Sequence, residues 1–139
     1  MDELTYIAIA PEGPLPPEFK TEPFRAVLVA DVQVSDRWRA SVADWLVISG
    51  CRYMMAWGAD CSAWDDAVDE ASVLREDFNA DDESQFVMTT WHEAEPLVEV
   101  FWFAKNSAAH PALSFNQTLL VHITGDERKD DLEAMFKAA

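Results

Sequence analysis

The sequence predicts a single-domain α/β protein, a three-layer sandwich in which a mostly parallel sheet of five strands lies between two layers of helices. Short apolar segments alternate along the chain with longer amphipathic ones, in the order β-β-α-β-α-β-α-β-α. Strands joined by helical connections favour right-handed crossovers and parallel pairing, with helices on both faces of the sheet. The length of 139 residues is that of one domain, and half of the residues are apolar, which is enough for a dense core.

The first two predicted strands are separated by a proline-rich loop instead of a helix. Residues 4–10 (LTYIAIA) and 24–34 (FRAVLVADVQV) are rich in apolar and β-branched residues, which favour strands. Residues 11–23 contain five prolines and one glycine, so this segment cannot be a crossover helix. The first strand is therefore expected at an edge of the sheet, where it either pairs antiparallel to its neighbour or reaches the sheet through this loop.

A helix is predicted over residues 35–50, where the apolar spacing changes from that of a strand to that of a helix. Ser35 is a good N-cap, and Gly50 stands where a left-handed C-terminal residue is preferred. The apolar segment 51–58, stopped by Gly58, is expected to be an interior strand. The inner face of the helix is formed by Trp38, Val42, Trp45 and Leu46.

A second helix is expected over residues 62–77. Ser62 and Asp65 have the spacing of a capping box, with Asp in place of the usual Glu or Gln. Apolar residues at helical spacing, from Trp64 to Leu74, give this helix an inner stripe. Its acidic residues lie mainly outside that stripe: Asp65, Asp66, Asp69, Glu70, Glu76 and Asp77.

The C-terminal half contains two further strands and two further helices. Residues 85–92 and 113–123 are expected to contain the strands, and residues 125–139 a terminal helix. The segment 95–108 (EPLVEVFWFAKNSA) is open between the two structures, because Pro96 suits a first helical position whereas VEVFWFA alternates like a strand. A helix is the preferred interpretation, since a connection of this length between two strands suits a crossover.

The chain carries 26 acidic and 10 basic residues, a net charge of −16. Such a chain repels nucleic acid and anionic membrane surfaces, whose recognition needs clusters of Lys and Arg. Solubility, a cation or a basic protein partner remain as interpretations of the charge. Residues 60–83 contain ten acidic residues and one basic residue, Arg75. This density exceeds the net charge of about 2–8 that keeps a small domain soluble.

The sequence also argues against several locations and cofactors. It has no apolar run of the ~20 residues that a membrane span requires, and its acidic first residues do not form a secretory signal. Cys51 and Cys61 are too few for a disulfide framework, so reduced thiols and a cytoplasmic location are expected. No cofactor and no metal site are expected, because the sequence lacks phosphate-binding glycine motifs and zinc-ligand spacings.

In open α/β sheets, ligands bind outside the carboxyl ends of the strands. This rule predicts that any site lies at the rim formed by those ends. His122, inside the apolar segment LLVHI, is interpreted as a hydrogen-bonded core histidine. The other reactive and aromatic residues that the predicted strands bring to the rim are Asp31, Trp57, Asp60, Cys61, Trp91, His92 and Glu93.

Cys61 is the candidate nucleophile at this rim, because it precedes a predicted helix whose N-terminus favours a thiolate. His92 is the candidate base, with Asp31, Asp60 or Glu93 to orient its imidazole. Adjacent carboxylates oppose the thiolate, which leaves the alternative that Cys61 is a small buried residue at the start of the helix. The same carboxylates and His92 would offer ligands to a divalent cation, but no cation-binding motif accompanies them.

The leading interpretation is a non-enzymatic binding or accessory protein that meets a basic protein partner through the acidic helix 62–77 and nearby tryptophans. Small acidic inhibitors and immunity proteins act in this way. The comparison is with that class of protein and does not rest on a sequence match. Trp57 and Trp91 lie at adjacent strand ends, where they would stack on a planar ligand or a partner side chain. The expected contact residues are Trp57, Asp60, Asp65, Asp66, Asp69, Glu70, Trp91 and Glu93.

A regulator that binds a small ligand or a metal is one alternative function, and two others stay open. The first is a small enzyme with a site at the carboxyl ends of the strands, which uses Cys61, His92 and a carboxylate such as Asp31. The second is assembly into a homodimer, for which exposed tryptophans and long apolar runs would provide the contact surface.

Overall fold

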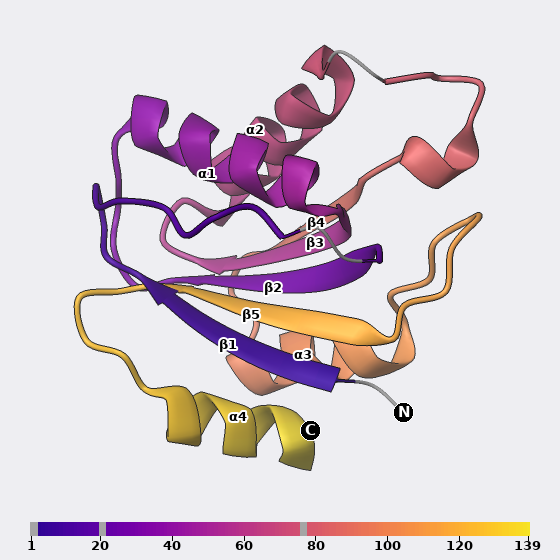
Figure 1. Ribbon diagram of the computed structural model, residues 1–139. Coiled ribbons are helices and arrows are strands. Elements are labelled where there is room, and N and C mark those ends of the chain that lie inside the picture. Colours follow the sequence, from indigo (N-terminus) through magenta and orange to yellow (C-terminus); the bar gives the residue numbers. More distant parts are fainter. Residues whose placement is uncertain (1–2, 20–21, 76–77) are drawn as a thin grey trace.

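In the part of the chain that the structure describes, five strands form one sheet between two layers of helices (Figure 1). The computed structural model describes residues 3–19, 22–75 and 78–139. Within them the strands are β1 (Glu3–Ile9), β2 (Phe24–Ala30), β3 (Cys51–Gly58), β4 (Met88–His92) and β5 (Gln117–Ile123). Their order in the sheet is β1-β5-β2-β3-β4, and every pairing between them is parallel. The predicted α/β class is confirmed, and the sheet is wholly instead of mostly parallel.

β1 pairs with β5 along its whole length, from Glu3 opposite Gln117 to Ile9 opposite Ile123. The other side of β5 pairs with β2. The antiparallel pairing considered for the first strand is therefore wrong. The physical reason is the length of the proline-rich loop, which returns the chain to the amino end of the sheet and lets β2 run in the same direction as β1.

The helices form two layers because the connections change face after β4. The helical segments are α1 (Asp36–Ser49), α2 (Cys61–Leu74), the short 3-10 helix η1 (Glu83–Gln85), α3 (Leu97–Asn106) and α4 (Lys129–Ala138). α1 and α2 lead from β2 to β3 and from β3 to β4 across one face (Figure 1). α3 returns the chain to β5 across the opposite face, where α4 also lies. The preferred helical interpretation of residues 95–108 is thus correct for most of the segment.

Side chains of the sheet alternate between two cores, one beneath each helix layer. β2 shows this most clearly, because all seven of its residues are buried. Leu28 packs in the core beneath α1 and α2, with Met54 and Trp64. Val27 packs in the other core, with Phe101 of α3. A strand with apolar residues on both faces requires cover on both faces, as interior strands of parallel sheets do.

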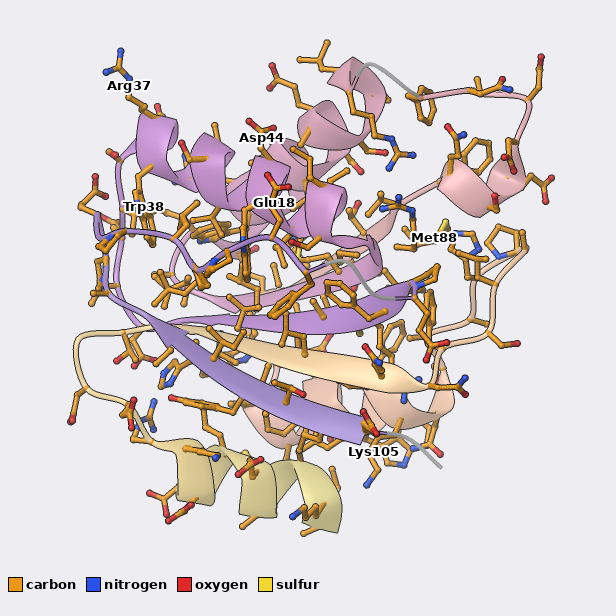
Figure 2. All side chains as sticks on the ribbon, in the orientation of Figure 1. Glu18, Arg37, Trp38, Asp44, Met88 and Lys105 are labelled. Atoms are coloured by element: carbon orange, nitrogen blue, oxygen red, sulfur yellow. The ribbon has the colours of Figure 1, made fainter. Side chains whose placement is uncertain are left out.

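The proline-rich loop takes the place of a crossover helix between β1 and β2. Nε1 of Trp38 donates a hydrogen bond to the carbonyl oxygen of Gly13 at 2.8 Å. Nε1 of Trp45 donates to the carbonyl oxygen of Pro17 at 3.3 Å. In Figure 2, Trp38 points from α1 toward this loop. Two tryptophans predicted as inner residues of the helix therefore also attach the loop to α1.

α3 and α4 are joined by a lysine. Nζ of Lys105, on α3, donates hydrogen bonds to the carbonyl oxygens of Phe136 and Ala139 at 3.0 and 2.8 Å. These carbonyls belong to the C-terminal end of α4, which Lys105 reaches in Figure 2. A cation at this position satisfies carbonyls that have no partner within the helix and complements the negative end of its dipole.

α1 begins and ends as its sequence predicts. The Ser35 hydroxyl oxygen accepts a hydrogen bond of 3.2 Å from the backbone N–H of Trp38. Gly50 follows the helix in a left-handed conformation, with a φ of 112°. Both termini depend on neighbouring residues in the sequence, which is why the local pattern was sufficient.

α2 does not begin as predicted. It starts one residue earlier, with Asp60 as N-cap in a left-handed conformation (φ 54°) and without a side-chain capping bond. The capping box expected between Ser62 and Asp65 is therefore not the start of this helix. The reason lies in the short turn after β3, where Ala59 N–H donates to the carbonyl oxygen of Ala30 at 2.9 Å. This bond to β2 fixes the turn and sets the helix start.

Gly58 ends β3 at a point where its backbone approaches β2 closely. Its φ is 101°, and a Cβ atom there would lie 2.2 Å from the carbonyl oxygen of Ala30. We expect Gly58→Ala to lower the free energy of unfolding by about 3 kcal/mol or more, through steric clash and the strained φ together. Urea denaturation of the two proteins measures the difference.

Gly125→Ala is the matched control, because a Cβ atom at that position meets nothing within 4 Å. Its free energy of unfolding should change by less than about 1 kcal/mol. Equal losses in the two variants would contradict the close approach at Gly58.

Candidate functional site

The chain leaves the carboxyl ends of β2 and β5 toward opposite faces of the sheet. β2 continues into α1 on one face, and its neighbour β5 continues toward α4 on the other (Figure 1). Such a divergence is a topological switch point, where open α/β sheets bind ligands. The topology therefore marks the ends of β2 and β5 as one part of the rim at which a ligand would have access.

Four side chains meet at this point, and we call them the rim network: Tyr6, Asp31, His122 and Arg128. The Tyr6 hydroxyl lies 2.6 Å from Nδ1 of His122, and Nε2 of the same ring lies 2.8 Å from Oδ2 of Asp31. Nη2 of Arg128 donates to both carboxylate oxygens of Asp31, at 3.2 and 3.3 Å. The backbone N–H of Arg128 donates to the Tyr6 hydroxyl at 3.1 Å. The network thus joins β1, β5, the end of β2 and the start of α4.

The imidazole of His122 has no exposed surface, so both of its nitrogens depend on these partners. The ionised carboxylate of Asp31 only accepts hydrogen bonds, so Nε2 carries a proton. When the ring is neutral, Nδ1 then accepts a hydrogen bond from the Tyr6 hydroxyl. A buried imidazole therefore connects a partly exposed phenol with a carboxylate, which provides a path for proton transfer along the rim.

The carboxylate of the rim network is ionised and its phenol is neutral. Burial raises the pKa of Asp31, but hydrogen bonds from Thr124 and His122, together with neighbouring positive charge, outweigh this effect. The pKa of Asp31 therefore lies below its ordinary value of 3.8. Burial also raises the pKa of Tyr6, and nearby carboxylates act in the same direction. The Tyr6 hydroxyl is consequently a hydrogen-bond donor and not a nucleophile near neutral pH.

Asp31 is the one candidate catalytic residue that belongs to the rim network. His122 is buried and hydrogen-bonded, as its interpretation as a core histidine requires, but its partners lie at the switch point. Tyr6 and Arg128 carry no sequence signal that points to this site. Tyr6 stands opposite Leu120 in the pairing of β1 with β5, and so shares a face with His122 two residues further on. Only the strand order reveals that relation.

Cys61 and the ring of His92 face different cores. Cys61, the first residue of α2, is buried in the core on the side of α1 and α2. The His92 ring packs against Phe103 of α3, with 5.2 Å between the ring centroids. Nε2 of His92 lies 2.8 Å from Oγ1 of Thr90, and Nδ1 lies 3.2 Å from Oε2 of Glu95. The thiol meets the backbone of His92 and not its imidazole. A catalytic role for this pair stays a prediction that no hydrogen bond between the two side chains supports.

The pKa values of both thiols are raised. Burial raises the pKa of Cys61, and the charge of Glu93 adds to the rise, against backbone hydrogen bonds that lower it. Burial raises the pKa of Cys51 to about 12. Carboxylate repulsion of the Cys61 thiolate was expected from the sequence, and the carboxylate that exerts it follows β4. Near neutral pH both side chains are therefore protonated thiols.

Acidic side chains line a groove between α1 and α2, which we call the acidic groove. The hollow has a volume of about 450 Å³. Asp36 and Asp44 line it from α1, and Asp66 and Glu70 from α2. Arg39 also lines it, and its guanidinium is paired with Asp36. The apolar part of the lining is made of small side chains and one leucine: Ala40, Ala63, Ala67, Ala71 and Leu74.

Two other acidic residues of α2 turn toward β4. Asp65 is buried, so its predicted place outside the inner stripe is wrong. Burial raises the pKa of Asp65, and the charges of Asp69 and Asp66 add to the rise. Asp69 accepts a hydrogen bond of 2.8 Å from the Thr89 hydroxyl of β4. The reason is the packing of α2 beside β4, which covers one flank of the helix and places a carboxylate within it.

The remaining expected contact residues lie at the carboxyl ends of β3 and β4. Nε1 of Trp57 donates to the carbonyl oxygen of Glu95 at 2.6 Å, which fixes this indole to the chain. Trp91 is 52 % exposed. Asp60 and Glu93 are exposed in the turns after the two strands. Of the two tryptophans singled out for stacking, Trp91 is the one with a largely free surface.

Within the described ranges, no three His, Cys, Asp or Glu side chains form a group that could hold a metal ion. No helix in that part of the chain is long and apolar enough to cross a membrane. Glu76 and Asp77, which the sequence assigned to the acidic helix, lie outside the described residues.

The comparisons with known proteins identify a family but no activity. A family model described as "Domain of unknown function (DUF7684)" matches residues 4–139. No curated protein matches the chain. A solved structure titled "Crystal structure of an hypothetical protein" is similar over 86% of this chain and 73% of its own, with 11% identity and a TM-score of 0.42. A similarity at this level carries no argument about function.

We expect both thiols to react slowly with iodoacetamide near neutral pH, because neither is ionised there. Cys61 should react faster than Cys51, whose pKa is raised to about 12 by complete burial. Peptide mass spectrometry after timed alkylation measures the two rates, and unfolded protein, in which both sites are open, is the control. Rapid alkylation of native Cys61 well below about pH 8 would contradict this expectation and support a nucleophilic role.

Asp31→Asn removes the negative charge of the rim network and keeps an oxygen that accepts a hydrogen bond from His122. Near neutral pH the variant should lose about 1–2 kcal/mol of unfolding free energy, because the ion pair with Arg128 is lost and the hydrogen bond from His122 no longer ends on a charged acceptor. The folded-state pKa of Asp31 is lowered, so its contribution is present above the pKa of the unfolded chain and is lost as pH falls through the folded value.

The difference between wild type and Asp31→Asn should therefore shrink below about pH 4. Urea denaturation of both proteins at a series of pH values measures it. A difference that stays constant down to the acid transition would show that the charge of Asp31 does not stabilise the fold.

Proposed function

The chain belongs to the DUF7684 family, and we propose that it is a non-enzymatic binding protein whose acidic groove receives a basic segment of a partner protein. The observation that carries the proposal is the groove itself. Four carboxylates stand around a hollow of about 450 Å³ with a floor of small side chains. The guanidinium of Arg39, which also lines the groove, is already paired with Asp36 of the same helix.

The lining suits long basic side chains for two reasons. Alanine side chains let a partner backbone come close to the helices, and the aliphatic stems of Lys or Arg can lie on such a floor while their charged ends meet the carboxylates. Arg and carboxylate also form paired, charge-assisted hydrogen bonds of high geometric specificity. The groove therefore favours a cationic segment over a neutral one.

The charge of the whole chain acts in the same sense. A net charge of −16 accelerates the encounter with a basic protein and repels acidic ones. Trp91, largely exposed beyond the other flank of α2, offers an aromatic anchor of the kind that dominates binding energy at interfaces. The proposed binding face thus extends from the acidic groove over α2 toward β4.

A second candidate, a small enzyme that works at the carboxyl ends of the strands, draws its support from the rim network. Asp31 and His122 are hydrogen-bonded at a switch point, whereas Cys61 and His92 are not joined through their side chains. Because His122 is wholly buried, a substrate would meet the Tyr6 hydroxyl instead of the imidazole. The acidic groove provides the more developed surface, so binding stays the preferred function.

Reversal of the groove charges tests the preferred function. Asp66→Lys with Glu70→Lys should weaken the binding of a fluorescent lysine-rich amphipathic peptide by at least about tenfold, because attraction in the groove becomes repulsion. Fluorescence anisotropy at physiological ionic strength measures the affinity. Thermal unfolding checks that the variant keeps its fold.

Glu99→Lys with Asp130→Lys is the matched control. These residues are exposed on the opposite helix layer, and their reversal changes the net charge by the same amount. The control should bind the peptide with nearly the affinity of the wild type. Equal weakening in both double variants would mean that net charge alone attracts the peptide, and the groove would lose its assigned role.

A further inference from the structure

β4 has one side without a neighbouring strand in the described part of the chain. Its five residues pair with β3, and β4 stands last in the order of the sheet. The backbone groups on the outer side of such a strand are a template for another extended chain. Proteins commonly block this template with Lys, Pro or a bulge. The sequence of β4, MTTWH, contains neither Lys nor Pro.

Exposed apolar side chains mark the same strand. Met88 is 36 % exposed and Trp91 is 52 % exposed. Thr89 and Trp91 project to the side on which Asp69 of α2 accepts the Thr89 hydroxyl. A chain laid along the outer side of β4 would therefore meet an indole and, next to it, a carboxylate.

An apolar hollow lies at the start of β4. It has a volume of about 270 Å³ and is bounded by the end of α2, the segment before β4 and Met88. Val73 of α2 is 58 % exposed beside it, and Asp69 stands at its margin. The hollow has room for at least one apolar side chain. Its other apolar lining residues are Phe78, Phe86 and Val87.

The charge around β4 selects between the chains that such an edge can accept. Residues 60–95 contain twelve acidic residues and one Arg, so a second copy of this protein would bring like charges together. A basic segment would meet complementary charge. The occupant that the surroundings favour is therefore an extended, lysine- or arginine-bearing segment of another protein.

We infer that β4 is a docking edge to which a basic partner adds an extended segment as a further parallel or antiparallel strand. Backbone hydrogen bonds to β4 supply affinity, Trp91 and the apolar hollow take alternate side chains, and Asp69 faces a cation. The inference rests on the proposed function for the basic character of the partner. It adds that the partner is read through its backbone as well as its charge.

Three synthetic peptides of alternating Lys and Val test the backbone contribution. Two are N-methylated along one edge each, at the Lys or at the Val amides, and the third is N-methylated along both edges. All three carry the same charge and side chains. At least one single-edge peptide should bind the full chain at least about tenfold more tightly than the doubly methylated peptide. The reason is that a single-edge peptide keeps a row of amide donors, whereas the doubly methylated peptide has none. The bound single-edge peptide should also protect amides of residues 88–92 from hydrogen exchange.

Two matched variants locate the binding. Trp91→Lys should weaken the binding of the single-edge peptide by about tenfold, since the substitution removes an aromatic anchor and places a cation on the edge of the sheet. Trp102→Lys is the control, because Trp102 is exposed to the same degree, 53 %, but lies on α3. It makes the same change of charge and should leave the affinity nearly unchanged.

Equal binding of the single-edge and doubly methylated peptides would overturn strand addition and leave the proposed basic partner intact. Equal weakening of peptide binding by both Trp variants would also overturn strand addition and leave the proposed basic partner intact, since charge alone would then explain the binding. Failure of all three peptides to bind, while the groove still binds the lysine-rich amphipathic peptide, also overturns the inference alone. If the lysine-rich amphipathic peptide also fails to bind, the proposed function is overturned as well.

Discussion

The burial of β2 on both of its faces constrains the rest of the structure. All seven residues of this strand are buried, and its alternating side chains enter two separate cores. Each core needs its own cover, because an apolar face left to water would cost about 25 cal/mol for each Å². α1 and α2 cover one face, and the proline-rich loop extends that layer past α1 through two indole hydrogen bonds. α3 and α4 cover the other face.

The same two-sided cover creates the rim network. Because the chain leaves β2 and β5 toward opposite layers, polar side chains fill the space at the divergence. A wholly buried imidazole is stable there only with a partner for each nitrogen, and Tyr6 and Asp31 provide them. Arg128 completes the arrangement and attaches the start of α4 to the end of β2. The same cluster of side chains therefore stabilises the fold and provides a path for proton transfer.

The acidic surface is divided by the packing of α2. One flank contributes Asp66 and Glu70 to the acidic groove, and the other contributes Asp69 to the border of β4. Asp65, which belongs to the same helix, is buried, and burial raises its pKa. The acidic residues that the sequence places outside the inner stripe of this helix thus form two distinct surfaces. Both suit cationic partners, one through side chains and the other through an open strand edge.

The sequence by itself determined the α/β class, both caps of α1 and the acidic character of residues 60–83. These features depend on spacing and composition within short segments. Only the tertiary structure decided that β1 stands beside β5, that Asp31 meets His122 instead of Cys61 and His92, and that Asp65 turns inward. Strand order and helix rotation are set by packing between segments far apart in the chain, and no local pattern encodes which distant segments will pair.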